Sequence, residues 1–175
     1  MALDLGPCQV LLGTAGAEAD IGKTQGGVRV AFSEDIVDLM SDQYGSQPED
    51  QMITGHTATV VTALADYSVD NLAIALNQDM LEYAPSEKGF KGSSLVGTKL
   101  STKGQSLLLK KYVDGAVSSN ENDWVRFPVA APTGAFELTF DGATQRVIEI
   151  TFQAFPDGND VLYFIGDENA AESGS

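Results

Sequence analysis

The chain has 175 residues, 43% of them hydrophobic, which is enough for one domain with its own core. Its 25 acidic residues outnumber its 10 basic ones and give a formal net charge of -15. This balance argues against a groove that neutralises nucleic-acid phosphates and against binding to an anionic membrane. The sequence shows no apolar run long enough for a signal peptide or a membrane span, so we expect synthesis in a reducing cytoplasm without export.

Most of the chain reads as short strands separated by turns. Val28, Val30 and Phe32 alternate with Arg29 and Ala31, as in a half-buried strand. Further strands are predicted at 57–65, 106–113, 124–129, 135–140, 145–155 and 161–165. Turn signals separate them at Pro132–Gly134, Asp141–Gly142 and Pro156–Gly158. This spacing predicts a mainly β fold, an antiparallel sandwich or barrel.

The predicted strand at 145–155 has two distinct faces. One face carries Ile148, Ile150 and Phe152. The opposite face carries Val147, Glu149, Thr151 and Gln153. We therefore expect the first face to lie in the core and the second to face outward.

One helix is predicted to flank the strands, over residues 68–80. Apolar residues recur at helical spacing between Val69 and Met80, and Ser68 is placed to cap the N-terminus. Asp70 lies in the first turn, where the helix dipole favours an acid. We expect one domain over residues 1–167, followed by a small, polar and flexible tail at 168–175.

The segment 38–55 does not fit a compact monomer. It is acidic, rich in turn residues, and longer than the roughly 12–15 residues of ordinary structureless loops. It also carries Met40, Tyr44, Met52 and Ile53, which are too many apolar residues for a disordered loop. Two interpretations remain open: an arm that orders against a neighbouring subunit, or a long hairpin packed on its own domain.

Residues 16–24 resemble a phosphate-binding loop. Five residues separate the two glycines, however, where that loop requires four, and Glu18 and Asp20 would place carboxylates against the phosphates. The residues that follow alternate as a strand, so no helix N-terminus is available for a phosphate. A hairpin turn is the preferred interpretation.

The remaining candidates for chemistry are isolated. His56 is the single histidine and has no second ligand or base nearby in the sequence, so a solvated or hydrogen-bonded role is expected. Cys8 is the single cysteine, lies in an apolar stretch, and is expected to be a buried, inert thiol. The segment Asp157–Asp160 lacks the length of a calcium loop and reads as a turn. Trp124 fits a core anchor and an interface residue equally well. We predict no catalytic site, no metal and no cofactor.

An ordered set of motifs resembles the phage tail tube (major tail) protein family. The N-terminal half supplies LGPCQV at 5–10, IGKTQGGVRVAF at 21–32, DQYG at 42–45 and ITGH at 53–56. The C-terminal half supplies FPVAAP at 127–132, GAFEL at 134–138 and QRVIEITFQAFPD at 145–157. The resemblance covers nearly the whole chain, and residues 82–104 match least.

The resemblance implies a β-sandwich with a flanking helix that forms hexameric rings. Such rings stack into a hollow tube, and DNA passes through the lumen without specific binding. The implied partners are other copies of the chain together with sheath, baseplate or initiator, tape measure and terminator proteins. The implied location is the tail of a virion assembled in the cytoplasm of a bacterial host.

The resemblance also assigns roles to particular residues. The long segment 38–55 is expected to contact neighbouring subunits and the adjacent ring through Met40, Asp42, Tyr44, Glu49, Asp50, Met52 and Ile53. An acidic lumen wall would repel DNA over about a Debye length, roughly 8 Å at physiological ionic strength. We expect Glu137 and Glu149 to face that lumen, and Arg126 and Arg146 to pair with acids of another subunit.

Three other functions compete with a tube subunit. Another component of the same fold, such as a tail terminator, a connector or the tube of a tail-derived particle, would share most of these features. A monomeric carbohydrate-binding module would need exposed aromatic residues in a groove, for which Tyr44, Trp124 and Tyr163 are the candidates. An enzyme is the weakest hypothesis, because the sequence offers no set of catalytic groups.

Overall fold

The structure, a computed structural model, describes residues 7–78, 80–84, 87–92, 96–134 and 146–169. The strands are β1 (Cys8–Thr14), β2 (Ala17–Asp20), β3 (Thr24–Met40), β4 (Pro48–Leu64), β5 (Met80–Ala84), β6 (Glu87–Phe90), β7 (Gln105–Val113), β8 (Ala116–Val117), β9 (Trp124–Pro132), β10 (Ile148–Phe155) and β11 (Phe164–Ile165). The helices are α1 (Val69–Ala75) and two 3-10 turns, η1 (Leu100–Lys103) and η2 (Glu121–Asp123). The predicted fold class, mainly antiparallel β with one flanking α-helix, is confirmed.

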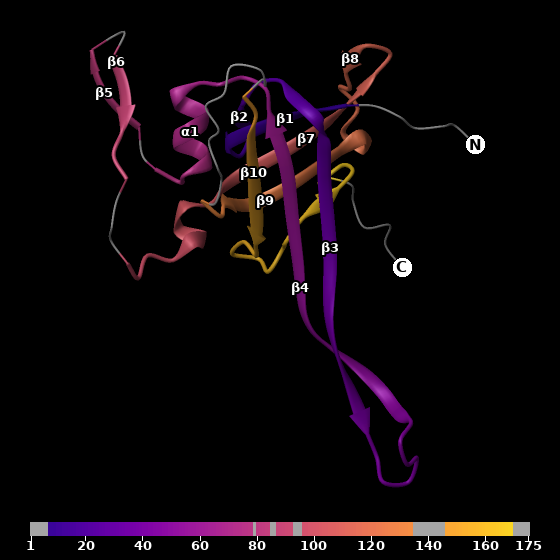
Figure 1. The fold of residues 1–175 in the computed structure, drawn as a ribbon. Coiled ribbons are helices and arrows are strands. Elements are labelled where there is room, and N and C mark those ends of the chain that lie inside the picture. The colour runs from indigo at the N-terminus through magenta and orange to yellow at the C-terminus, as the bar shows by residue number, and fades with distance from the viewer. Residues whose placement is uncertain (1–6, 79, 85–86, 93–95, 135–145, 170–175) are drawn as a thin grey trace.

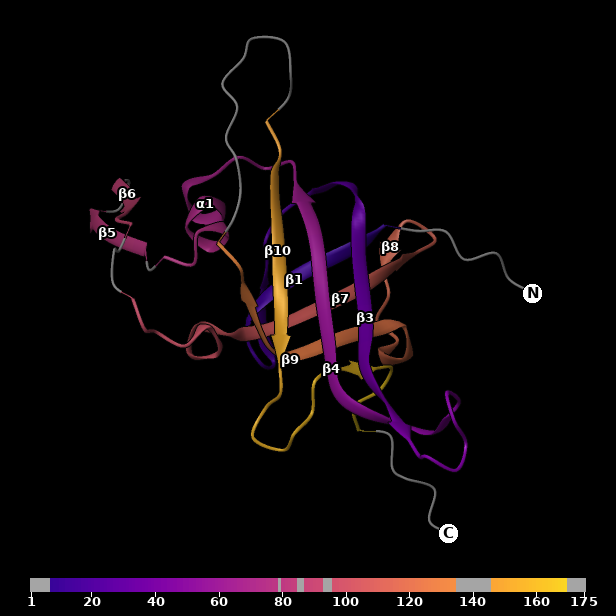
Figure 2. The ribbon, with the colours of Figure 1, turned by 60° about the horizontal axis from the view of Figure 1, so that its bottom comes forward.

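One antiparallel sheet forms the body, in the order β2-β1-β7-β9-β10-β4-β3. The short strands β8 and β11 pair with β7 and β9, and β5 and β6 form a separate hairpin. Figure 2 shows β10, β4 and β3 crossing steeply over β1, β7 and β9. The sheet therefore folds over on itself between β9 and β10 and makes two layers with the core between them.

Side-chain alternation along β10 explains how the layers pack. Ile148, Ile150, Phe152 and Ala154 are buried, and the residues between them are exposed or half-buried, as the sequence predicted. The opposing layer fills the core with Val10, Leu107, Leu109 and Phe127. Because both layers contribute mostly Leu, Ile, Val and Phe, burial of apolar surface holds them together.

Helix α1 begins where the sequence predicted and ends earlier. The Ser68 hydroxyl accepts a hydrogen bond from the Asn71 amide at 3.1 Å, which confirms the N-cap. The helix ends at Ala75 rather than at residue 80, because Asn77 adopts a left-handed conformation with φ of 56°. Met80, the last residue of the predicted apolar spacing, begins β5 instead.

Other predicted elements differ at their edges. The strand expected at 161–165 is reduced to Phe164–Ile165. The segment from Asp157 to Asp160 is a turn, as expected, in which an Asp157 carboxylate oxygen accepts from the amides of Asn159 and Val161 at 2.8 and 2.9 Å. The strand expected at 135–140 lies outside the described residues. Within the described part of the chain, no helix is long and apolar enough to cross a membrane.

Candidate functional site

The most prominent feature of the surface is the hairpin formed by β3 and β4. Each strand has 17 residues, and their outer halves extend beyond every other element (Figure 1). The segment 38–55, expected as a long loop, is therefore mostly strand, and only residues 41–47 join the two strands. Of the two interpretations of this segment, the structure has the hairpin of the second and the projecting arm of the first: the hairpin extends away from its own domain.

A bulge marks the place where the hairpin leaves the body. The register shifts after Asp35, which lies opposite Gly55, so that Ile36 lies opposite Ile53 and Thr54 is the extra residue. The Thr54 hydroxyl donates to the Asp35 carbonyl at 3.1 Å and secures the bulge. Bulges bend and twist a strand pair, and Figure 1 shows that the β3–β4 ribbon twists and bends toward its outer end. We call the part beyond the bulge, residues 36–53, the arm.

Both faces of the arm expose apolar side chains. Ile36 and Ile53 are direct cross-strand neighbours on one face, and each is 51% exposed. Val37 and Met52 are neighbours on the other face, 52% and 54% exposed. A two-stranded hairpin alone in water is marginally stable at best. A ribbon that exposes apolar pairs on both faces therefore has the properties of a surface that is covered by a partner.

All seven arm residues predicted from the sequence are exposed. Met40 ends β3, Asp42 and Tyr44 lie in the turn, and Glu49, Asp50, Met52 and Ile53 follow on β4. The sequence reasoning missed Ile36, Val37 and Leu39, because it ended the first strand at Phe32. The signal was present, since the run IVDLM at 36–40 continues a β-branched, apolar pattern.

The outer face of β10, β4 and β3 is a second candidate surface, and it carries Glu149. Glu149 is exposed and lies opposite Ala63 of β4, and the neighbouring row contains Val61 and Arg29. The described part of this face thus presents an acid and a base rather than acids alone. The other residue expected to face a lumen, Glu137, lies outside the described residues, so a lumen-facing role for either stays a prediction.

Arg126 has acidic partners within its own chain. Its side chain is 14% exposed, is ion-paired with Glu168, and has Nε 3.7 Å from an oxygen of Glu18. Burial raises the pKa of the Glu18 carboxyl group. This effect is outweighed by hydrogen bonds from the Ser106 hydroxyl and from the backbone amides of Glu18 and Gly16, together with the positive charge of Arg126. The net pKa is therefore lowered. Glu168 is anchored by this pair, although the sequence placed it in a flexible tail; residues 170–175 lie outside the described part.

The predicted pairing of Arg126 with another subunit is thus not needed to satisfy its charge, and it stays a prediction. Arg146, the other basic residue with that predicted role, is exposed and lies two residues before β10. Its guanidinium lies 5.3 Å from the centre of the Tyr67 ring. That contact holds Arg146 against its own domain. Its predicted contact with another subunit, like that of Arg126, stays a prediction.

The residues weighed for chemistry lie apart from one another. The segment 16–24 forms the β1–β2 turn, β2 and the link to β3, which confirms the hairpin interpretation. His56 has Nδ1 3.5 Å from Glu34, and both side chains are more than half exposed. Cys8 is half-buried rather than fully buried, and burial raises the pKa of its thiol. Among the described residues, no three His, Cys, Asp or Glu side chains gather to hold a metal.

The aromatic residues of the binding-module hypothesis occupy three separate places. Trp124 is half-buried, donates from Nε1 to the Ser118 carbonyl at 2.9 Å, and has the Lys110 ammonium 3.9 Å from its ring centre. Tyr163 packs against Phe32, with ring centres 4.6 Å apart, at the root of the hairpin. Tyr44 lies in the turn of the arm. In the described structure these rings do not line a shared groove.

Comparison with known proteins gives a structural match alone. No protein-family model and no curated protein matches the sequence. A solved structure that the chain resembles is a chain of the sheath–tube complex, in the extended state, of an extracellular contractile injection system called PVC. The TM-score is 0.53 at 13% sequence identity, and the match covers 88% of each chain. The chain is therefore similar in fold to a component of that complex over most of its length.

Proposed function

We propose that this chain is the subunit of a tail tube, which assembles from copies of itself. The observation that carries the proposal is the arm: a hairpin that leaves the domain and exposes apolar side chains on both faces. The fold match to a sheath–tube complex supports the same conclusion, because it relates the fold to a tubular particle.

The apolar surface of the arm can contribute a large part of the free energy that association requires. Ile36, Val37, Leu39, Met40, Tyr44, Met52 and Ile53 are each 40–57% exposed. Full burial of such a side chain is worth about 1.5–3 kcal/mol, so covering the exposed half contributes roughly 0.7–1.5 kcal/mol for each residue. Association also costs translational, rotational and side-chain freedom. The seven side chains together contribute about 5–10 kcal/mol, which is comparable with the roughly 4–15 kcal/mol that association costs, so the arm supplies a large share of the driving force when every copy gives one arm and receives another.

The position of the arm suits head-to-tail contacts. It extends from one end of the domain, so it reaches a neighbour more readily than its own body (Figure 1). When the giving and receiving surfaces differ, repetition of one contact closes a ring or continues as an open stack. The sheet also ends in β2 and β3, whose outer edges have no strand partner in the described chain. Unpaired edges of this kind favour pairing with another chain.

The finer features of the proposal follow from the family resemblance. Six copies form each ring, the rings stack, and DNA passes through the lumen into a host without specific binding. Sheath, baseplate or initiator, tape measure and terminator proteins are the other partners, and the particle is a phage tail built in a bacterial host. The function needs no cofactor and no catalysis. The net charge of -15 supports passage of DNA, because an acidic protein does not retain phosphates.

Negative-stain electron microscopy over a range of protein concentrations tests the proposal. Hollow tubes or stacks of six-fold rings are the expected result. Single rings that do not stack would assign the chain to a terminator or connector instead. A chain that stays monomeric even with baseplate components added as an initiator would refute self-assembly.

A further inference from the structure

The basic residues of this acidic protein are concentrated in one stretch of sequence. Residues 88–111 contain six of the ten Lys and Arg residues and no Asp or Glu. The six are Lys88, Lys91, Lys99, Lys103, Lys110 and Lys111. The arm shows the opposite bias, because residues 36–53 contain four acids and no Lys or Arg. The chain thus separates an acidic projection from a basic segment.

The fold places four of these lysines on the side of the molecule that carries α1. Lys88 follows the start of β6 and forms an ion pair with Asp70 of α1 at 3.1 Å. Lys91 follows β6 directly, Lys99 precedes η1, and Lys103 is the last residue of η1. Figure 1 shows β6, α1 and η1 on one side of the body. The arm leaves the body at a different end, away from these elements. The acidic and basic regions of one chain are therefore held apart, and they can meet only between copies.

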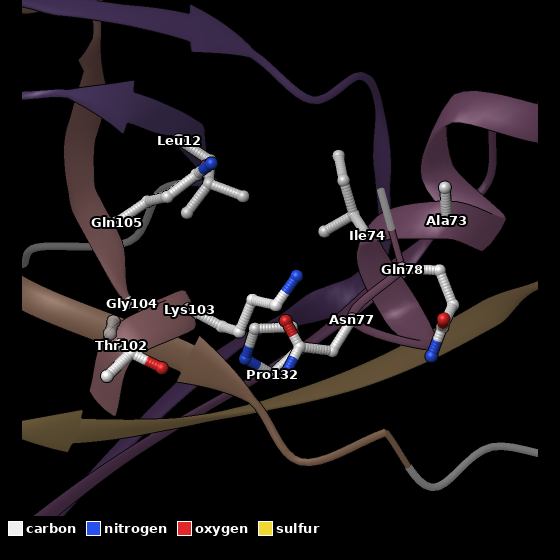
Figure 3. Close-up of a pocket in the computed structure, with 11 residues that line it drawn as sticks. Leu12, Ala73, Ile74, Asn77, Gln78, Thr102, Lys103, Gly104, Gln105 and Pro132 are labelled. Atoms are coloured by element: carbon white, nitrogen blue, oxygen red, sulfur yellow. The ribbon is translucent and has the colours of Figure 1, made fainter. Parts of the chain in front are cut away.

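A groove lies among these elements, between the end of α1, η1 and the end of β9. It consists of two adjoining cavities of about 440 and 420 Å³. The cavities share Asn77, Gln78, Lys103 and Pro132, and Lys99 lines the second. Figure 3 shows the first cavity, into which the Lys103 side chain extends from η1. Among the described residues that line the two cavities, none is acidic.

We infer that this groove receives the arm of a second copy of the chain. Lys99 and Lys103 face the carboxylates of Asp42 and Asp50, and the Tyr44 side chain of the arm turn enters the cavity. The inference rests on the proposed self-assembly and names the receiving surface, which neither the fold match nor the family resemblance specifies. Charge complementarity identifies the occupant, because opposite potentials favour this contact and like charges disfavour others.

A zero-length carbodiimide cross-linker tests the contact, because it joins a carboxylate to a lysine amine only where the two groups touch. Isotope-labelled and unlabelled copies of the full chain are mixed, allowed to assemble, cross-linked and analysed by peptide mass spectrometry. We expect mixed-isotope peptides that join Lys99 or Lys103 to Asp42 or Asp50. Copies that assemble and cross-link only through other residues would overturn the groove and leave the proposed function standing. Copies that neither assemble nor cross-link would refute both.

Charge reversal provides a second readout. Asp42→Lys with Asp50→Lys, or Lys99→Glu with Lys103→Glu, places like charges across the contact and raises the assembly concentration by about tenfold or more. All four changes in one chain restore opposite charges and return the assembly concentration toward that of the unmodified protein. A combined variant that assembles no better than either pair alone would overturn the inference.

The matched control uses lysines at the far end of β7. Lys110→Glu with Lys111→Glu makes the same change in net charge away from the groove. Added to the arm reversal, this pair is expected to give no rescue, and thermal unfolding verifies that each variant is folded. Rescue by the control pair to the same extent would show that net charge governs assembly, and it would overturn the specific groove.

Discussion

Replacing both Ile36 and Ile53 with alanine is expected to weaken assembly while leaving the folded monomer intact. The two side chains are direct cross-strand neighbours beyond the bulge, and each is 51% exposed. They contribute little to the core of their own domain, since they lie outside the buried cluster between the two layers. Their remaining exposed surface is available to a second copy.

The size of the effect follows from the surface left to bury. Covering the exposed half of each isoleucine contributes about 0.7–1.5 kcal/mol, so the pair contributes about 1.4–3 kcal/mol for each arm. Because about 1.4 kcal/mol corresponds to a tenfold change in an equilibrium constant, the assembly concentration should rise about 10- to 100-fold. The free energy of unfolding of the monomer should change by less than about 1 kcal/mol, as for exposed positions generally.

Sedimentation of assembled material over a dilution series measures the assembly concentration, and thermal unfolding of dilute protein measures monomer stability. Val37→Ala with Met52→Ala is the matched variant on the opposite face of the arm. The face whose variant has the larger effect is the face that docks. Unchanged assembly in both variants would refute the reasoning, and so would a large loss of monomer stability, which would show that the arm packs on its own domain.

Three further predictions concern the domain itself. Phe152→Ala removes a fully buried ring and should lower the free energy of unfolding by about 3–5 kcal/mol. The thermal midpoint should fall by about 2–4 °C per kcal/mol. Phe155→Ala, at a half-buried position of the same strand, should lower it less. Ser68→Ala removes the cap of α1 and should cost about 1 kcal/mol in chemical unfolding, whereas Ser68→Thr keeps the hydroxyl. The third prediction concerns Glu18. Burial raises the pKa of its carboxyl group, but the hydrogen bonds that this group accepts, including the one from Ser106, lower the pKa by more. A carboxyl group with a lowered pKa in the folded state stabilises the protein at pH values above the ordinary glutamate pKa, and this stabilisation is lost as the pH falls through the lowered pKa. Glu18→Gln removes the titrating group, so the free energy of unfolding of this variant should change less with pH in the acidic range.

Local patterns in the sequence were sufficient to predict the fold class. Alternation along β10 identified Ile148, Ile150 and Phe152 as core residues, and all three are buried. The Ser68 cap was equally readable, because an N-cap depends on residues within one turn of the helix. Strand alternation and N-caps depend on residues that are close together in the sequence. They can therefore be predicted from a single sequence.

The end of α1 could not be predicted in the same way. Apolar spacing continued to Met80, but Asn77 takes a left-handed conformation and Met80 enters a strand. Many residue types cap helix ends, and where the chain leaves a helix depends on what packs beyond it. The intrachain ion pairs of Arg126 could not be predicted for a related reason, and its predicted pairing with another subunit stays a prediction. Its partners Glu18 and Glu168 lie far from it in the sequence, and only the fold brings them together.

The sequence by itself determined that the chain is an acidic, mainly β domain with an unusual segment at 38–55 that is too apolar for a disordered loop. Only the tertiary structure decided that this segment is the end of a projecting hairpin, with apolar pairs on both faces, and that the lysines of 88–111 gather partly beside a groove on another side. The physical reason is that period-two alternation records which residues share a face of a strand, but not whether another layer covers that face. Coverage depends on contacts between distant parts of the chain, and for the arm it depends on contacts beyond the chain.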